Sequence, residues 1–504
     1  MKRNYLGLAI ALLGSGLASA DQASDSTAVG LTVYNGGYAL VRDQRTINLK
    51  SGQNSVEVPD VAAMIDPTSV LLKSIDKPQG LEILEQNYQY DVITPDNILD
   101  KSVGANVTIR RQNDQNGKAE WVYDTGTLLN PTKVFLPPDD VNSYGNSAVE
   151  TSTGGVVVRL KNGSVLLRPE GEVILEKLPD GLHPRPLLNW LVKSADDGAQ
   201  KIEVSYMTNG IGWSSDYVAL VGENDDKLDL AGWVTMKNNS GATYKDAQLT
   251  LLAGDVKRIQ PAQPMYKTMR MASMSDMSES APQFEEKSFF EYHIYNMQRP
   301  TTIRDRESKQ LSLLNAAEVP AHKEMIYDPR GDWWRGWFPY SNGGGDPGGG
   351  MDTSNNHKVK VVLEVKNAKE NNMGMPLPKG KVRVYKKDSD GRQQFIGEDE
   401  IDHTPKDETI RLYIGDAFDV VGDFKRTDYS RVNDHTQEEA FEIKIRNHKA
   451  TAVDVSVVDY VWSDWKIVKK SQDYKEKDAH TIEFPVHVEA DGEAVITYRV
   501  RTEW

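Results

Sequence analysis

The chain has 504 residues, no cysteine and a formal net charge of −15 at pH 7. Without cysteine it can form no disulfide, thiol nucleophile, zinc–thiolate site or iron–sulfur cluster, and its acidic balance disfavours nucleic acid and anionic lipid as partners. A chain of this length can be stabilised by its core alone and is long enough for several domains.

Residues 1–20 have the pattern of a cleaved export signal. Lys2 and Arg3 form a basic start, an apolar run follows, and Ala18-Ser19-Ala20 supplies the small residues of a cleavage site. The apolar run is too short to cross a bilayer, and no later run approaches the roughly 18 residues that a transmembrane helix needs. We therefore expect a periplasmic or extracellular protein without a membrane span.

The next segment, residues 21–90, is predicted to be an N-terminal β domain. Val33 to Val41 has the pattern of two strands joined by a turn at Asn35-Gly36-Gly37. Residues 45–49 and 55–58 alternate polar and apolar side chains, as half-buried strands do.

Residues 91–200 are predicted to form a small barrel-like β domain with one short helix. Thr94 can cap that helix, Pro95 suits its first position and Gly104 can end it. Residues 156–167 predict a hairpin with Asn162-Gly163 at its turn, because this pair tolerates positive φ angles. The short apolar run 187–192 favours a strand.

Residues 201–504 are predicted to form a β-sandwich region, because strand patterns and Gly, Asn and Asp turns recur along it. Gly210 and Gly212 predict a tight bend that lets Trp213 pack between sheets. Residues 260–286 and 328–356 lack strand periodicity and are predicted to be mobile connections. The expected fold class is therefore all-β and multidomain.

Several blocks in this region have a recognisable order along the chain: Ser205 to Trp213, Gly232-Trp233-Val234, Leu251 to Val256, Glu291 to Tyr295 and Pro376 to Tyr385. Together they resemble the bacterial domain-of-unknown-function family 4139, some members of which are labelled mucoidy inhibitor-like. The resemblance covers residues 202–504 and implies a β-rich exported protein. It implies no cofactor or catalytic set, and residues 333–350 lie outside its pattern.

An aromatic cluster in residues 328–356 is the predicted contact site, and it contains Trp333, Trp334, Trp337 and Tyr340. Exposed aromatic rings offer flat apolar faces that bind sugars, peptides or proteins. The alternative is a small core that folds this loop back onto the sandwich.

A methionine cluster lies in residues 260–286 and comprises Met265, Met269, Met271, Met274 and Met277. Thioethers are soft ligands that suit Cu(I), so periplasmic copper binding is one hypothesis. The alternative is a linker whose methionines bind nothing or are oxidised sacrificially.

Signatures of common enzymes are missing from the sequence. It has no G-x-S-x-G nucleophile elbow, no P-loop, no dinucleotide fingerprint and no histidine pair at the spacing of a helical zinc site. Asp388 to Gly391 resembles the start of a calcium loop but is interpreted as a hairpin turn. Paired carboxylates of a polysaccharide hydrolase remain an alternative, because such groups meet in space and not in sequence.

These observations predict an exported, non-catalytic binding or structural protein of the cell envelope. The expected partner is an envelope protein or a glycan, and no cofactor is expected. The secreted hydrolase and the copper-binding protein remain the alternative hypotheses.

Overall fold

The computed structural model describes residues 21–115, 118–136, 149–254, 256–258, 283–330, 356–388 and 390–504. Within these ranges the chain is mainly β-strand, with one short α-helix and 3-10 turns at Pro67–Ser69 and Lys369–Asn371. The predicted all-β, multi-sheet fold is confirmed. No helix in the described ranges combines the length and apolar character that crossing a bilayer requires.

An eight-stranded sheet forms one layer of the main body, in the order β19-β20-β18-β2-β3-β15-β5, with β21 paired to β18. Strand β2 pairs in parallel with β18 and antiparallel with β3. Strands from the predicted N-terminal domain and the C-terminal region therefore share this sheet. Its strands are β2 (Ala28–Tyr34), β3 (Tyr38–Leu49), β5 (Leu71–Ser74), β15 (Gly198–Asn209), β18 (Tyr244–Ala253), β19 (Phe284–Phe289), β20 (Tyr292–Met297) and β21 (Thr301–Ile303).

A second sheet packs against the first and begins in the order β25-β24-β16-β17-β22-β23-β26. Its strands are β16 (Ile211–Val221), β17 (Lys227–Asn238), β22 (Glu307–Tyr327), β23 (Lys358–Lys366), β24 (Gly380–Lys387), β25 (Gln393–Ile401) and β26 (Thr409–Asn433). One large hydrophobic core lies between the two layers. This arrangement is β-sandwich-like.

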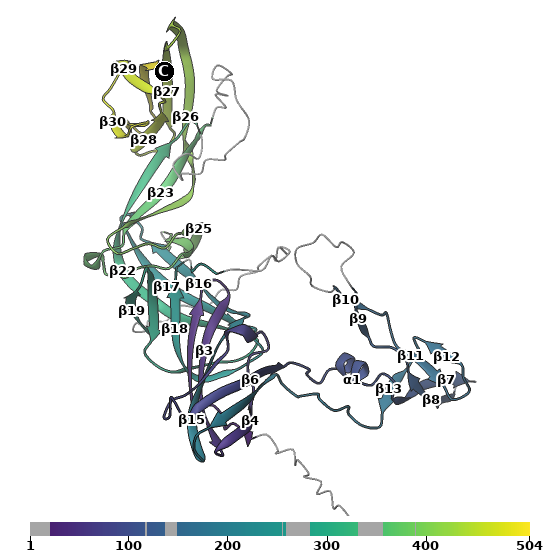
Figure 1. The fold of residues 1–504 in the computed structure, drawn as a ribbon. Helices are drawn as coiled ribbons and strands as arrows, with labels where there is room; N and C mark the ends of the chain where they lie inside the picture. The colour runs from purple at the N-terminus through teal and green to yellow at the C-terminus, as the bar shows by residue number, and fades with distance from the viewer. Residues whose placement is uncertain are drawn as a thin grey trace, which may run out of the picture.

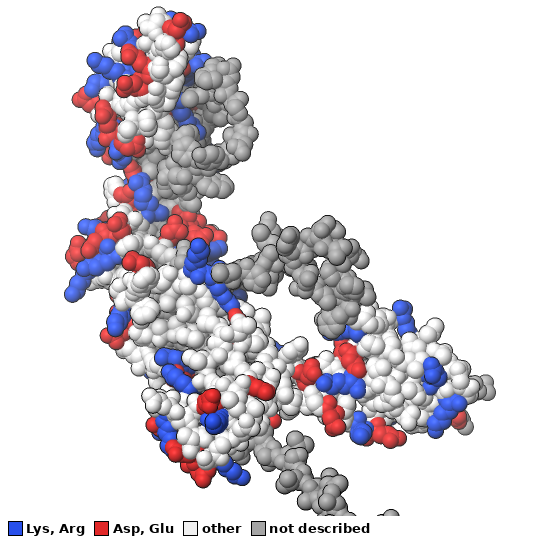
Figure 2. Space-filling model, in the orientation of Figure 1, with Lys and Arg blue, Asp and Glu red and all other residues white. Residues whose placement is uncertain are grey.

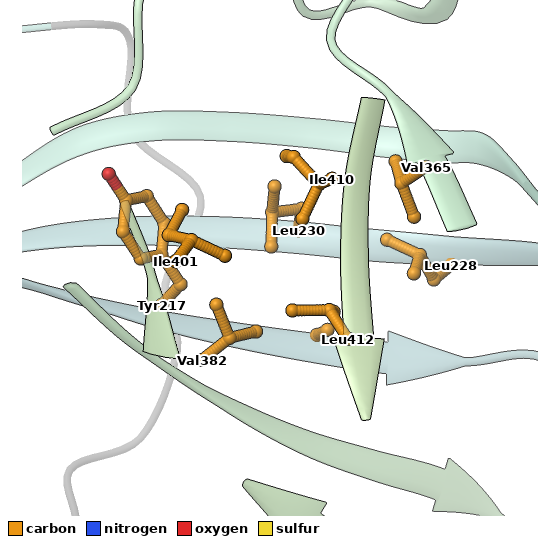
Figure 3. Close-up of a pocket in the computed structure, with 9 residues that line it drawn as sticks. Tyr217, Leu228, Leu230, Val365, Val382, Ile401, Ile410 and Leu412 are labelled. Atoms are coloured by element: carbon orange, nitrogen blue, oxygen red, sulfur yellow. The ribbon is translucent and has the colours of Figure 1, made fainter. Parts of the chain in front are cut away.

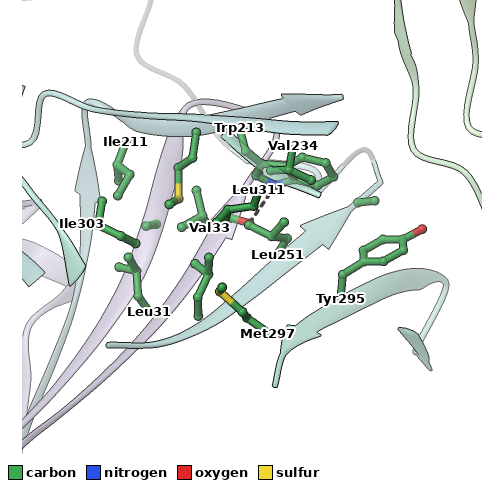
Figure 4. Packing of buried hydrophobic residues seen from close by; sticks show 14 of the residues in the cluster. Leu31, Val33, Ile211, Trp213, Val234, Leu251, Tyr295, Met297, Ile303 and Leu311 are labelled. Carbon is green, nitrogen blue, oxygen red and sulfur yellow. Dashed lines mark hydrogen bonds between the residues drawn. The ribbon is translucent and has the colours of Figure 1, made fainter. Parts of the chain in front are cut away.

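Trp213 lies inside this core, as predicted (Figure 4). Gly210, at φ 77°, turns the chain from β15 in the first sheet into β16 in the second. The buried indole then reaches back across the core, and its N–H donates a hydrogen bond to the Val33 carbonyl at 3.0 Å. The bend therefore places one aromatic side chain in contact with both layers.

The second sheet continues into a C-terminal sandwich, through β26-β27-β32-β29 and the paired strands β28, β31 and β30. These strands are β27 (Thr436–Asn447), β28 (Val453–Tyr460), β29 (Asp464–Lys470), β30 (Lys475–Asp478), β31 (Thr481–Val488) and β32 (Glu493–Glu503). The sandwich has its own core, which includes Phe441, Phe484 and Tyr498. Figure 1 shows it beyond one end of the main body, with β23 and β26 running between the two units.

A third unit is inserted into a β-hairpin of the main body. Strands β6 (Leu81–Gln89) and β14 (Leu187–Ser194) are antiparallel, with Gln89 directly opposite Leu187. Strand β14 lies beside β4 (Gly52–Pro59), which pairs in parallel with β1 (Asp21–Gln22). Residues 90–186 leave and re-enter the main body between these two paired strands, and the described part of this segment forms a unit that projects from its side (Figure 1).

The projecting unit contains an open five-stranded sheet in the order β12-β11-β8-β7-β13, so its described strands form no closed barrel. Helix α1 packs on one face, where Leu99 contacts a core of Val107, Ile109, Leu128 and Val158. The predicted cap is confirmed, since the Thr94 hydroxyl accepts from the Asn97 N–H at 3.1 Å. The elements are α1 (Pro95–Lys101), β7 (Asn106–Gln115), β8 (Lys118–Leu128), β11 (Val157–Leu160), β12 (Val165–Leu167) and β13 (Glu172–Leu175), with β9 (Lys133–Leu136) and β10 (Val149–Ser152) in a separate ribbon.

Candidate functional site

The two clusters singled out in the sequence lie outside the described residues. These are the aromatic cluster, with Trp333, Trp334, Trp337 and Tyr340, and the methionine cluster of residues 265–277. Their roles in binding a partner or copper stay predictions.

The residues on either side of the aromatic segment are described, and they are anchored in the C-terminal sandwich. The Arg330 Nε donates to Asp459 Oδ1 at 2.6 Å, and its guanidinium lies over the Phe424 and Phe441 rings at 5.3 and 5.2 Å. Burial raises the pKa of Asp459, while the nearby Arg330 lowers it in part. Asn356 donates its side-chain amide to the Asp328 carbonyl at 2.8 Å, so the chain leaves and returns at neighbouring points.

An exposed aromatic surface lies on the open face of the projecting sheet. In β8 the side chains of Trp121 and Tyr123 point away from α1, and they are 53% and 58% exposed. Side chains two apart on a strand lie on one face about 7 Å from each other. We define the aromatic face as the surface formed by these two residues, by Thr125 on the same strand, and by Gln112, Arg110, Thr108 and Ile174 on the next two strands.

Alternation along the neighbouring strand explains why these side chains face solvent. In β7, Val107 and Ile109 are buried against α1, so Thr108 and Arg110 point to the opposite side. The register pairs Arg110 with Tyr123 and Thr108 with Thr125, and it pairs Ile174 of β13 with Thr108. The aromatic face therefore lies on a sheet whose other side is packed.

Arg110 orients the aromatic face without giving it a free positive charge. Its guanidinium lies over the Trp121 ring at 4.8 Å from the centroid. The same group is paired with the Glu172 carboxylate, to which its Nε donates at 2.8 Å. The aromatic face therefore offers apolar surface from two rings. It also offers hydrogen-bonding groups, namely the neutralised Arg110 guanidinium and the hydroxyls of Thr108 and Thr125.

Reasoning from sequence did not single out Trp121 or Tyr123. The signal that could have found them is the run Trp121 to Thr125, in which aromatic and hydroxyl side chains alternate with Val122 and Asp124. This alternation separates two faces, but it does not say which one packs. That choice is set by the position of α1 on the folded sheet.

The main body contains a small apolar cavity where the second sheet curls (Figure 3). Its volume is about 10 Å³, close to the minimum that holds one water molecule. Its lining is entirely apolar in surface and comes from six strands, with Tyr217, Leu230, Ile401 and Leu412 among the side chains. An apolar space of this size is a packing defect and not a ligand site.

Two of the described histidines each lie within hydrogen-bond distance of one carboxylate. The His293 Nδ1 lies 2.7 Å from Glu286 Oε1, and the His487 Nδ1 lies 2.7 Å from Asp454 Oδ1. The hydrogen bond to Asp454 raises the pKa of His487. Within the described ranges, no group of three or more His, Asp or Glu side chains is placed to hold a metal ion.

The fold and the aromatic face together define a β-sandwich-like protein with an inserted sheet that presents aromatic rings to solvent. No known family model matches the chain, and no curated protein matches it. The resemblance to the domain-of-unknown-function family 4139 therefore stays a prediction.

Proposed function

We propose that this chain is an exported, non-catalytic binding protein of the cell envelope that captures a polysaccharide on the aromatic face. The observation that supports this is the pair of exposed rings, Trp121 and Tyr123, side by side on an open sheet. Folding alone does not favour exposure of two large aromatic side chains, because burying each one would lower the free energy of the folded state. The export pattern of residues 1–20 supports the envelope location.

The chemistry of the aromatic face favours a neutral sugar chain over other ligands. Sugar rings have apolar faces that stack on aromatic rings, and their hydroxyls pair with threonine, glutamine and arginine side chains. A nucleic acid would require free positive charge, but Arg110 is already paired with Glu172. Figure 2 shows acidic and basic side chains intermixed on the drawn surface, without a broad basic area.

A pull-down with insoluble polysaccharides tests this proposal. The full chain without residues 1–20 is mixed with peptidoglycan, chitin or cellulose, and the protein left in solution is measured. We expect binding to at least one of these, and Trp121→Ala with Tyr123→Ala should weaken it about 30-fold or more, since the two aromatic contacts together contribute at least about 2 kcal/mol.

The matched control is Phe418→Ala, which removes a ring that is 96% exposed on the C-terminal half of the chain. This variant should bind as the unchanged protein does, and all variants should keep the same thermal midpoint. The proposal is wrong if none of the three polysaccharides binds, or if the double variant binds as tightly as the unchanged chain.

The hydrolase and copper hypotheses remain predictions from the sequence. Nothing among the described residues specifically favours either of them.

A further inference from the structure

A cleft lies where the projecting unit joins the main body. It has a volume of about 360 Å³ and is lined by Tyr88, Gln89, Tyr90, Asp91, Lys101, Gly181 and His183. Backbone hydrogen bonds hold the two connecting segments together at its base: the Ile93 N–H donates to the His183 carbonyl and the His183 N–H to the Asp91 carbonyl, both at 2.9 Å. The cleft thus has walls from the end of β6, from α1 and from the returning chain.

Two tyrosines form the aromatic side of the cleft. Their ring centroids are 5.7 Å apart with planes tilted by 32°. The Tyr88 hydroxyl donates to the Ala63 carbonyl at 3.0 Å, which fixes this ring against the main body. The Tyr90 ring is 67% exposed, and its hydroxyl makes no hydrogen bond to another described residue.

The polar side of the cleft has charged groups that neutralise each other. The Lys101 Nζ lies 2.9 Å from Asp91 Oδ2. The His183 imidazole has no hydrogen-bond partner among the described residues. Gly181 has a φ of 77°, a backbone conformation that favours glycine, and a Cβ there would lie 3.4 Å from the Lys101 Nζ.

We propose that this cleft binds one neutral sugar ring. An anionic ligand would have to compete with Asp91 for Lys101, and a cationic ligand with Lys101 for Asp91. A neutral polyol can accept from the ammonium and donate to the carboxylate while the ion pair stays intact. The exposed Tyr90 ring offers a stacking surface, and the volume suits a small ligand.

This proposal is independent of the polysaccharide proposal, since it involves other residues and a single sugar unit. Its ligand would contact β6 of the main body and α1 of the projecting unit at once. Binding would therefore favour one relative arrangement of these two units over others.

Saturation-transfer NMR on the full chain without residues 1–20 tests the cleft. The probes are glucose, galactose and N-acetylglucosamine, each added up to about 10 mM, which detects a Kd of about 1 mM. We expect transfer to at least one sugar, and Tyr90→Ala and Asp91→Asn should each weaken its binding about tenfold or more. The absence of transfer to all three sugars would overturn the proposal.

One further variant separates the cleft from the aromatic face. The double variant Trp121→Ala and Tyr123→Ala should keep its sugar signal, so a failure of the polysaccharide pull-down would leave the cleft proposal standing. If Tyr90→Ala and Asp91→Asn keep full sugar binding while the thermal midpoint is unchanged, the sugar binds elsewhere and the cleft proposal is wrong.

Discussion

Asp225 forms ion pairs that link the turn between β16 and β17 to strands β22 and β24. It lies in the turn between β16 and β17 at φ 60°, where its carboxylate contacts Lys323 of β22 at 2.5 Å and also Lys386 of β24. Burial raises the pKa of this carboxyl, but hydrogen bonds and charge from the two lysines outweigh burial and lower it overall.

Asp225→Asn should destabilise the protein at neutral pH only. Because the folded pKa is lower than the unfolded value of about 3.9, the ionised carboxylate stabilises the fold above that pH. This contribution disappears as the pH falls through the folded pKa. We expect a loss of about 1–2 kcal/mol at pH 7, and little difference from the unchanged chain once the pH is below the folded pKa.

Urea unfolding at neutral and acidic pH measures this difference. Asparagine tolerates a positive φ, so the substitution changes charge while the turn is kept. The matched control is Asp226→Asn, next along the chain, which should change little because Asp226 is exposed. An equal loss at both pH values for Asp225→Asn would contradict the role of charge.

At the scale of elements, the crossing from β15 to β16 depends on one backbone conformation. Gly210→Ala should cost about 1–3 kcal/mol, because a Cβ at φ 77° would lie 2.9 Å from the Asn239 carbonyl oxygen. Gly222→Ala is the control, since its Cβ would meet the Lys227 carbonyl oxygen at 3.5 Å, an ordinary contact. Denaturant midpoints of the two variants should therefore differ clearly, and equal midpoints would refute this account.

Local signals predicted several elements correctly. The cap at Thr94, the hairpin around Asn162-Gly163, the strand at 187–192 and the buried Trp213 are all found in the fold. At the hairpin only Gly163 has a positive φ, 88°, so the expected positive φ at Asn162 is not found. Each depends on residues close in sequence or on alternation along one strand. These signals are short-range, which is why they could be found without a structure.

Long-range pairing was not predictable in the same way. The parallel pairing of Leu31 with Leu249, and the insertion of residues 90–186 into one hairpin, join segments that are far apart in sequence. The alternation of side chains along a strand shows which of them share a face, but it does not show which other strand pairs with that strand. The aromatic face was missed for the same reason, because the packed side of β8 depends on α1.

At the scale of the whole molecule, the insertion predicts that the main body can fold without the projecting unit. Replacement of residues 90–186 by Asn-Gly would join Gln89 to Leu187 through a two-residue turn, since these residues are directly opposite each other. We expect the shortened chain to keep its β-sheet circular dichroism and to unfold cooperatively. It should lose binding at both the aromatic face and the cleft.

Direct fusion of Gln89 to Leu187 provides the control for this deletion. Without turn residues, the ends of β6 and β14 cannot stay paired, so this variant should unfold at a lower denaturant concentration. Aggregation or a gradual transition of the Asn-Gly variant would show that the main body needs the projecting unit in order to fold.

The C-terminal sandwich is joined to the main body by shared strands. Strand β22 has 21 residues and β26 has 25, and both pair with β23 along part of their length. A flexible peptide linker would stretch under tension before any hydrogen bond broke. Here the backbone hydrogen bonds that pair β23 with β22 and β26 would have to break together. The two ends of this protein are thus coupled mechanically, and a pulling force on the C-terminal unit would be transmitted into the central layers.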